Sequence, residues 1–130
     1  QKILKELMLE NVLLGTAKRA KIDGYDIGGK TATGEKVNSR GKYDQNKLVS
    51  SFLSVFPIKK PKYISLVLFD EPVISDIKNK YQGATGGLTA APVTAEILKR
   101  AMPLLGITSK KIPEPDIHLK EKDKLNFAAY

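Results

Sequence analysis

The strongest constraint on the fold is a pair of charge-free segments separated by a very short connection. Leu48 to Phe56 and Tyr63 to Phe69 are rich in β-branched, aromatic and other apolar residues, and neither face of either segment carries a charge before Asp70. This pattern predicts two strands covered on both faces. Only Pro57 to Lys62 lies between them, and a parallel crossover needs a dozen residues or more. The two strands are therefore expected to form an antiparallel hairpin.

The residues before this hairpin predict one helix and one further strand. Apolar residues recur at helical spacing from Lys2 to Leu14, and Gly15 stands where a C-terminal cap glycine is expected. The pattern from Thr16 to Gly24 predicts a basic loop. Tyr25 to about Thr33 is expected to be extended, although its glycines weaken the strand pattern. Gly34 to Asn46 is polar and reads as a loop.

A second helix is predicted after the hairpin. Thr89 is the expected N-cap and Pro92 suits the first turn, while Pro103 disturbs the last turn and Gly106 closes it. The order helix, strand, strand, strand, helix predicts an α+β fold, an antiparallel three-stranded meander flanked by an N-terminal and a C-terminal helix. We expect one domain portion over residues 1–108 and a Lys- and Pro-rich tail over 109–130.

Composition bounds the possible functions. The 130 residues are 42% hydrophobic, contain no cysteine and carry a net charge of +8. No apolar run reaches the roughly 18 residues of a membrane span, and the absence of an initiator methionine suggests a fragment or processed product. Arginine is scarce and the lysines are scattered, which favours a solvated lysine-rich exterior. A small basic nucleic-acid-binding module stays an alternative, and it requires lysines clustered on one face.

The run from Gly24 to Thr31 satisfies the spacing of a phosphate-binding loop, Gly-x-x-x-x-Gly-Lys-Thr. Asp70 and Glu71 end an apolar strand, as in a magnesium-binding strand of nucleotide hydrolases. Such a loop must follow a buried strand and open a helix. The preceding residues are basic, and no helical period follows Thr31, so a P-loop nucleotide-binding protein is the less favoured alternative. Asp70 and Glu71 are expected to cap a turn rather than bind metal.

The stretch Lys30, Thr31, Ala32 and Thr33 supports a different chemistry, acyl transfer. On a strand at the edge of a sheet, the lysine ammonium attracts a substrate carboxylate and the threonine hydroxyls hydrogen-bond it. A backbone N–H of the strand can complete an oxyanion hole. A small residue between the threonines lets a peptide substrate lie against the strand as an added strand.

The surroundings of this stretch resemble the C-terminal part of class B penicillin-binding proteins, the peptidoglycan D,D-transpeptidases. The resemblance covers about residues 3 to 107, and the segments that carry it follow in order: Gly15 to Ala20, Gly24 to Lys36, Ser51 to Pro57, Tyr63 to Pro72 and Gly86 to Pro92. The segments Ser51 to Pro57 and Phe69 to Pro72 look most like the division-type, septal enzymes. The resemblance implies a fragment of the penicillin-binding transpeptidase and β-lactamase-like fold.

The resemblance also implies roles for single residues. Lys30 matches the lysine of the Lys-Thr-Gly box and is expected to be catalytic. Thr33, also expected to be catalytic, matches the threonine that binds the substrate carboxylate and lends its N–H to the oxyanion hole. Thr31 and Ala32 complete the substrate-binding strand, with Ala32 in place of the box glycine. The implied ligands are the D-Ala-D-Ala end of the peptidoglycan stem peptide and β-lactams, with no cofactor and no metal.

The family's nucleophile motif, Ser-x-x-Lys, and its Ser-x-Asn are expected upstream of Lys2. Ser39 and Ser75 fit the first motif by letters, but both lie in polar, turn-rich contexts unsuited to a nucleophile. We therefore expect an inactive isolated chain that carries one wall of the site. Its apolar sheet, left without upstream residues, is expected to self-associate. The parent is implied to be anchored by an upstream helix, to face the periplasm at the inner membrane, and to work with cell-division proteins. His118, in the tail, is expected to have no catalytic role.

Overall fold

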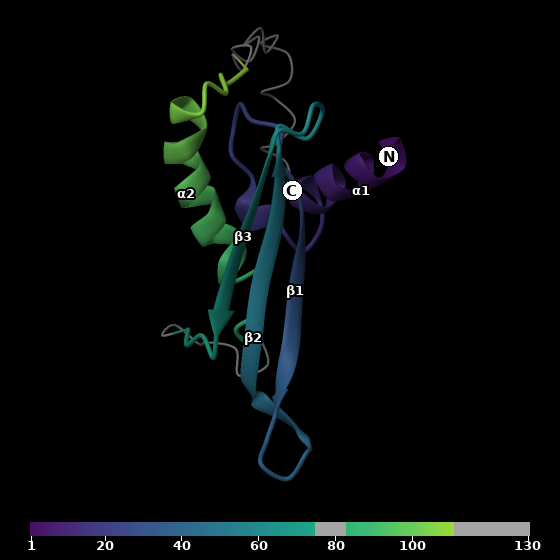
Figure 1. The fold of residues 1–130 in the computed structure, drawn as a ribbon, viewed down its shortest axis with the longest axis vertical. Helices are drawn as coiled ribbons and strands as arrows, with labels where there is room; N and C mark the ends of the chain where they lie inside the picture. The colour runs from purple at the N-terminus through teal and green to yellow at the C-terminus, as the bar shows by residue number, and fades with distance from the viewer. Residues whose placement is uncertain (75–82, 111–130) are drawn as a thin grey trace, which may run out of the picture.

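A computed structural model describes residues 1–74 and 83–110 and shows two helices beside one sheet (Figure 1). The elements in order are α1 (Lys2–Leu13), the short 3-10 helix η1 (Lys18–Ala20), β1 (Gly28–Val37), β2 (Tyr43–Phe56), β3 (Tyr63–Asp70) and α2 (Ala90–Leu104). The sheet has the order β1-β2-β3, and both pairs are antiparallel. The predicted α+β meander with flanking helices is confirmed. The predictions for Ser75, His118 and residues 111–130 fall outside the described residues.

The predicted loop from Gly34 to Asn46 is wrong. β1 continues to Val37 and pairs with β2 as far as Val37 opposite Tyr43, with a register shift after Glu35. The turn is closed by Asn38, whose side-chain oxygen accepts from the N–H groups of Arg40 and Lys42 at 2.9 and 3.1 Å. This half of the hairpin extends beyond the helices (Figure 1). Because it covers no core, its sequence carries no apolar alternation by which a strand can be recognised.

One face of the sheet packs against α2 and forms the core. Residues Phe52 and Phe56 of β2 are 0% and 3% exposed, and they contact two clusters of buried side chains. The clusters draw on both helices and on the segments around η1: Val12, Ala17, Ala20, Ala90 and Ala91 in one, and Ile22, Ile27, Ala95, Leu98 and Met102 in the other. A hydrogen bond joins the sheet to the start of α2, since Oγ of buried Ser50 and Oγ1 of half-buried Thr89 are 2.6 Å apart. We call this the inner face.

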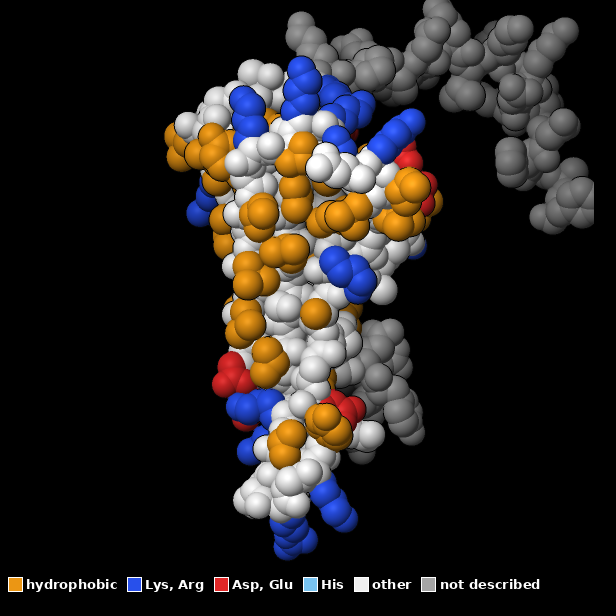
Figure 2. Space-filling view, turned by 45° about the vertical axis from the view of Figure 1, so that its right-hand side comes forward, with side chains coloured by type: hydrophobic (Ala, Val, Ile, Leu, Met, Phe, Trp, Pro, Cys, Tyr) orange, Lys and Arg blue, Asp and Glu red, His pale blue; other side chains and the backbone are white. Residues whose placement is uncertain are grey.

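The opposite, outer face is open, so the expectation that both faces are covered is met on one side only. Leu53 is 38% exposed, and Ile64, Leu66 and Leu68 are between 56% and 71% exposed. These residues alternate with the buried ones and pair across the strands, for example Leu53 with Leu66. Figure 2 shows hydrophobic side chains running down the molecule, with most of the Lys and Arg side chains of this side at its upper and lower parts. Charge-free strands signal two apolar faces, but within the described residues the second is covered only near Gly28, where Ile58 and Met8 lie against β1.

The helix ends refine two sequence expectations. Gly15 does not have the positive φ of a cap glycine; instead a Cβ there would lie 2.4 Å from the Asn11 side-chain oxygen, so glycine is required by close packing. Thr89 occupies the N-cap position of α2, but its hydroxyl donates to the carbonyl of Thr85 at 2.8 Å rather than capping the helix. Gly106, with φ of +70°, ends α2 as expected.

Neither helix of the described part of the chain is long and apolar enough to cross a membrane.

Candidate functional site

The strand β1 lies at the edge of the sheet, and its residues alternate between the two faces. Thr31 pairs with buried Phe52 and Thr33 with buried Ser50, so both threonine side chains belong to the inner face. Lys30 and Ala32 belong to the outer face and are exposed. The structure thus brings all four predicted site residues to one edge strand, but divides their side chains between its two sides.

The free edge of β1 offers backbone groups to a ligand. The carbonyl oxygen of Gly29 accepts from Asn11 Nδ2 at 2.9 Å, and that of Thr31 accepts from Lys30 Nζ at 2.7 Å, so both carbonyls point away from β2. In an antiparallel pair every second residue directs its N–H and C=O to the same side. The N–H of Thr33 therefore faces the free edge as well. Although the Lys30 side chain starts on the outer face, its ammonium reaches this edge.

A cleft of about 410 Å³ lies beside this edge, and four of its nine lining residues are threonines. It is lined by Gly15, Thr16, Lys18, Arg19, Thr31, Thr33, Thr85, Gly87 and Leu88. Thr31 is 8% exposed, and its Oγ1 lies 2.7 Å from Thr16 Oγ1. Thr33 is exposed, and its Oγ1 accepts from the N–H of Gly86 at 3.1 Å. The cleft is thus built by β1 together with the segments that follow α1 and precede α2.

Seven of the nine lining residues were not predicted as site residues, and three of them, Thr16, Lys18 and Arg19, were expected to be part of a basic loop. Lys18 and Arg19 are exposed cations that line the cleft. They supply the positive field that a carboxylate ligand needs, in addition to Lys30. The sequence signal that could have identified these residues is the segment from Gly15 to Ala20. This segment resembles the transpeptidase family, but it contains no recognised functional motif.

Two glycines allow the last wall of the cleft to approach β1. A Cβ on Gly86 would lie 2.3 Å from the carbonyl oxygen of Ser51 and 2.7 Å from that of Ala32. A Cβ on Gly87 would lie 2.4 Å from the carbonyl oxygen of Thr16. All these neighbours are backbone atoms that cannot move aside cheaply, so both positions require glycine.

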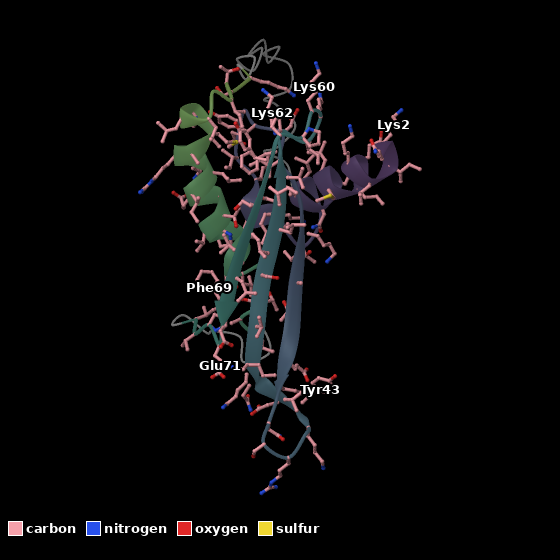
Figure 3. All side chains as sticks on the ribbon, viewed as in Figure 1. Lys2, Tyr43, Lys60, Lys62, Phe69 and Glu71 are labelled. Atoms are coloured by element: carbon pink, nitrogen blue, oxygen red, sulfur yellow. The ribbon has the colours of Figure 1, made fainter. Side chains whose placement is uncertain are left out.

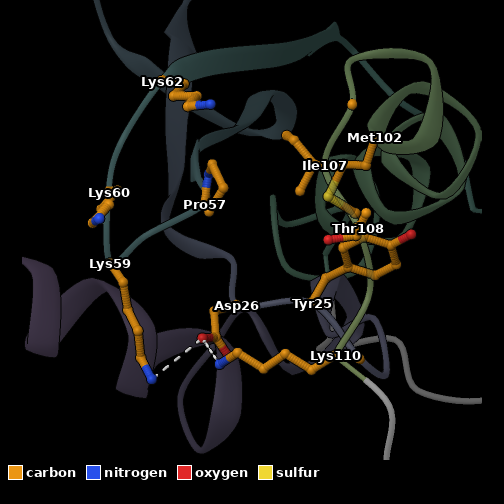
Figure 4. Close-up of a pocket in the computed structure, with 12 residues that line it drawn as sticks. Tyr25, Asp26, Pro57, Lys59, Lys60, Lys62, Met102, Ile107, Thr108 and Lys110 are labelled. Carbon is orange, nitrogen blue, oxygen red and sulfur yellow. Dashed lines mark hydrogen bonds and ion pairs between the residues drawn. The ribbon is translucent and has the colours of Figure 1, made fainter.

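A second cavity, of about 360 Å³, lies between the β2–β3 connection and the segment after α2 (Figure 4). Lys59 and Lys110 both pair with Asp26 there, and the hydrogen bond to Asp26 raises the pKa of Lys110. None of the four predicted site residues lines it. Figure 3 shows Lys60 and Lys62 at this end of the molecule and Tyr43 at the opposite end, beside the hairpin tip.

The structure also places the residues of the less favoured predictions. The run from Gly24 to Thr31 leads into β1 and opens no helix, so the geometry of a phosphate-binding loop is absent from it. Asp70 and Glu71 pair with Lys36 at 2.9 and 2.7 Å, and no metal-binding cluster of His, Cys, Asp or Glu occurs among residues 1–74 and 83–110. Ser39 lies exposed in the hairpin turn.

Comparison with known proteins agrees with this geometry. Residues 1–99 match the family model described as the penicillin binding protein transpeptidase domain. A probable peptidoglycan D,D-transpeptidase FtsI of Caulobacter vibrioides is 37% identical over 101 residues, which cover 74% of this chain and 17% of that protein. The transpeptidase domain of FtsI4 from Legionella pneumophila superposes with a TM-score of 0.65 at 30% identity, covering 78% of this chain and 34% of that one. The apo transpeptidase domain of penicillin-binding protein 3 from Burkholderia pseudomallei gives the same TM-score at 28% identity, covering 84% and 30% of the two chains.

The chain therefore spans about a sixth of the length of the curated relative and about a third of the solved domains.

Proposed function

Because this chain belongs to the family of penicillin-binding-protein transpeptidase domains, we propose that it forms one wall of the active site of a peptidoglycan D,D-transpeptidase. The observation that carries the proposal is the free edge of β1. There the Lys30 ammonium, the outward N–H of Thr33 and a cleft lined by threonine hydroxyls lie together. The remaining walls are contributed by other parts of the same domain.

The proposed chemistry is acyl transfer through a serine ester. A serine hydroxyl of an upstream Ser-x-x-Lys motif attacks the carbonyl of the D-Ala-D-Ala bond, and the amide bond breaks to release D-Ala with a proton on its amine. An acceptor amine then attacks the ester and restores the serine hydroxyl. In both steps, negative charge develops on the carbonyl oxygen, and the N–H of Thr33 is placed to stabilise it. Lys30, Lys18 and Arg19 attract the terminal carboxylate of the substrate.

The same edge accounts for inhibition by β-lactams, because a β-lactam presents a carboxylate next to a reactive amide. The serine opens the lactam ring, and the ring nitrogen takes the proton and stays attached. We further propose that the parent protein acts in septal cell-wall synthesis from the periplasmic side of the inner membrane. The support is the similarity to D,D-transpeptidases named FtsI and FtsI4. We also propose that the parent protein binds other proteins of the cell-division machinery.

The experiment is labelling with a fluorescent penicillin, followed by intact mass and peptide mapping. The full-length protein that carries this chain is expected to form a stoichiometric adduct on a serine outside the 130 residues. The 130-residue chain alone is expected to remain unlabelled. A folded full-length protein that takes no label contradicts the proposed function, and an adduct on Ser39 contradicts the assignment of the nucleophile.

The nucleic-acid alternative finds less support. A basic module of that kind needs its lysines on one face, whereas on the side seen in Figure 2 the Lys and Arg side chains are spread along the molecule and form no single continuous patch. An affinity for nucleic acid that falls steeply with salt concentration would favour that alternative.

A further inference from the structure

The cavity of about 360 Å³ beside the β2–β3 connection has no role in the proposed function, and it shares no lining residue with the cleft beside β1. Three segments enclose it: Gly24 to Asp26 ahead of β1, Pro57 to Lys62 between β2 and β3, and Gly106 to Lys110 after α2 (Figure 4). We call it the lysine cavity, because four of its twelve lining residues are lysines.

Backbone hydrogen bonds hold the three walls of the lysine cavity together. The carbonyl oxygen of Asp26 accepts from the N–H of Ile58 at 2.9 Å, and that of Gly24 accepts from the N–H of Lys110 at 2.8 Å. Ile58 is 2% exposed and so anchors the β2–β3 connection in the fold. Gly24 has a φ of +82°, a conformation that glycine adopts at little cost. The cavity is therefore fixed by the main chain rather than by the positions of long side chains.

The lining of the lysine cavity has an excess of positive charge. It contains Lys59, Lys60, Lys62 and Lys110 but only one carboxylate, Asp26. This carboxylate lies 3.7 Å from Lys59 Nζ and also pairs with Lys110, while Lys60 and Lys62 make no ion pair within the described residues. Four lysines against one carboxylate leave three positive charges, whose mutual repulsion an entering anion would relieve.

The other side of the cavity is apolar. Figure 4 shows the lysines of the β2–β3 connection on one side and Tyr25, Met102 and Ile107 on the other. Met102 is 1% exposed, and Tyr25 and Ile107 pack against the buried cluster to which it belongs. A cavity with one cationic and one apolar side suits an anion that carries an apolar group.

The type of cation favours a phosphate over a carboxylate. No arginine lines the cavity, and it is the planar guanidinium fork of arginine that matches a planar carboxylate. Lysine acts as a compact point charge and commonly binds phosphate. A phosphate monoester carries a charge of about −1.5 to −2 at pH 7, which balances several ammonium groups better than the single charge of a carboxylate.

We infer that the lysine cavity is a second binding site and that its ligand is an organic phosphate ester. The phosphate group lies among the lysines, and the apolar part of the ester lies against Tyr25, Met102 and Ile107. The site does not depend on the acyl-transfer chemistry proposed for β1.

The test measures binding to the full-length protein by titration calorimetry at constant low ionic strength. The probe is phenyl phosphate. Benzoate keeps the ring but has a single planar charge, and inorganic phosphate keeps the charge but lacks the ring. Phenyl phosphate is expected to bind about tenfold more tightly than either. Benzoate of equal affinity would overturn the assignment of a phosphate, and inorganic phosphate of equal affinity would overturn the role of the apolar side.

Two substitutions in the cavity are expected to act in opposite directions. Lys60→Met/Lys62→Met removes two exposed charges that hold no ion pair within the described residues, and it is expected to weaken binding of phenyl phosphate about tenfold or more. Asp26→Asn removes the negative charge that faces the anion, and it is expected to strengthen binding about threefold or more. A merely structural role of Asp26 would not increase the affinity.

Matched controls lie at the other end of the sheet. Lys47→Met and Asp44→Asn make the same changes of charge in β2 near the hairpin tip, and neither is expected to alter the affinity. Circular dichroism and thermal unfolding verify that each variant is folded.

The source of the ester is tested by competition. Dihexanoyl phosphatidic acid, a water-soluble lipid, is expected to displace phenyl phosphate if the natural ligand is a lipid headgroup. No displacement indicates a soluble phosphate ester, and both results support the same site. Binding of phenyl phosphate that Lys60→Met/Lys62→Met leaves unchanged overturns the inference. So does binding that only Lys30→Ala abolishes, because the anion would then occupy the cleft beside β1, and so does a wild-type protein that binds no phenyl phosphate.

Discussion

At the scale of single residues, the glycines of β1 show how closely the edge strand is fitted to its neighbours. A Cβ on Gly29 would lie 2.3 Å from the ring of Phe52 and 2.6 Å from the carbonyl oxygen of Leu53. A Cβ on Gly34, five residues further along the same strand, would meet nothing within 4 Å. The two glycines therefore have different reasons to be present, and only the first is required by packing.

We predict that Gly29→Ala destabilises the fold by about 1–3 kcal/mol, the usual cost of overpacking. Gly34→Ala is the matched control, and it is expected to be neutral or to stabilise by about 0.5–1 kcal/mol, because alanine loses less backbone entropy on folding. Urea unfolding followed by circular dichroism measures both. Equal effects of the two substitutions would show that the contacts at Gly29 are relieved by a small shift of the strand.

The ammonium group of Lys30 and the hydroxyl and N–H of Thr33 lead to a prediction on the rate of acylation. In the full-length protein, Lys30→Ala and Thr33→Ala are each expected to slow acylation by β-lactams about a hundredfold, the typical effect of losing one such contact. The measurement is the second-order rate constant with a reporter penicillin. Wild-type rates in both variants would mean that the substrate does not lie against β1.

Ala32 offers the converse test at the same edge. Its methyl group lies on the exposed outer face, between the two threonines that line the cleft. Ala32→Gly removes this methyl and is expected to keep or raise the acylation rate, since the backbone edge stays the same. A loss of more than about tenfold would show that the strand depends on alanine for its conformation.

At the scale of elements, the projecting half of the β1–β2 hairpin is tied to β3 by one lysine. Lys36 Nζ lies 2.9 Å from Asp70 Oδ1 and 2.7 Å from Glu71 Oε1. Glu71, with φ of +49°, has a backbone conformation that non-glycine residues rarely adopt. The hydrogen bonds to Glu71 and then to Asp70 raise the pKa of Lys36 above its usual value.

This raised pKa predicts an alkaline loss of stability. A lysine whose pKa is higher in the folded state contributes fully below its unfolded pKa of about 10.4, and the contribution is lost as pH rises through the folded pKa. Lys36→Met is expected to lower the melting temperature at pH 8, and this difference from wild type is expected to shrink above pH ~11. Lys47→Met, an exposed lysine without an ion pair in the described residues, is the control. A pH-independent difference for Lys36 would rule out the charge as its cause.

At the scale of the whole molecule, the sheet has one buried and one open face. The open face carries Leu53, Ile64, Leu66 and Leu68, each at least 38% exposed. Apolar surfaces that extend beyond a few hundred Å² normally bind a partner or aggregate. In a larger transpeptidase domain this face would be covered, whereas the 130-residue chain alone leaves it in water.

We predict that the isolated chain self-associates through this face. Light scattering over a concentration series is expected to show oligomers, and Leu66→Glu is expected to reduce them by placing a charge at the centre of the face. Leu104→Glu makes the same change at an 88% exposed leucine of α2, and it is expected to leave association unaltered. A wild-type chain that is monomeric at high concentration and binds no dye for apolar surfaces would contradict the prediction.

The sequence alone determined the elements that bury apolar residues and the antiparallel pairing of β2 and β3. Periodicity and the short Pro57–Lys62 connection are local signals, and they sufficed for α1, α2 and the core half of the sheet. The Lys30–Thr33 stretch was also recognised as a candidate site, because its motif is contiguous. The projecting half of the β1–β2 hairpin was not predicted, because exposed polar strands show no alternation of apolar and polar residues.

Only the tertiary structure decided which side of β1 each site residue occupies and what completes the cleft. Thr16, Lys18 and Gly86 lie far from Thr33 in sequence and reach it only because α1 and the segment before α2 fold against the strand edge. The contacts that join Thr31, Thr16, Asn11 and Gly29 likewise link separate elements. Contacts of this kind form only in the assembled fold, so no local pattern of residues can specify them.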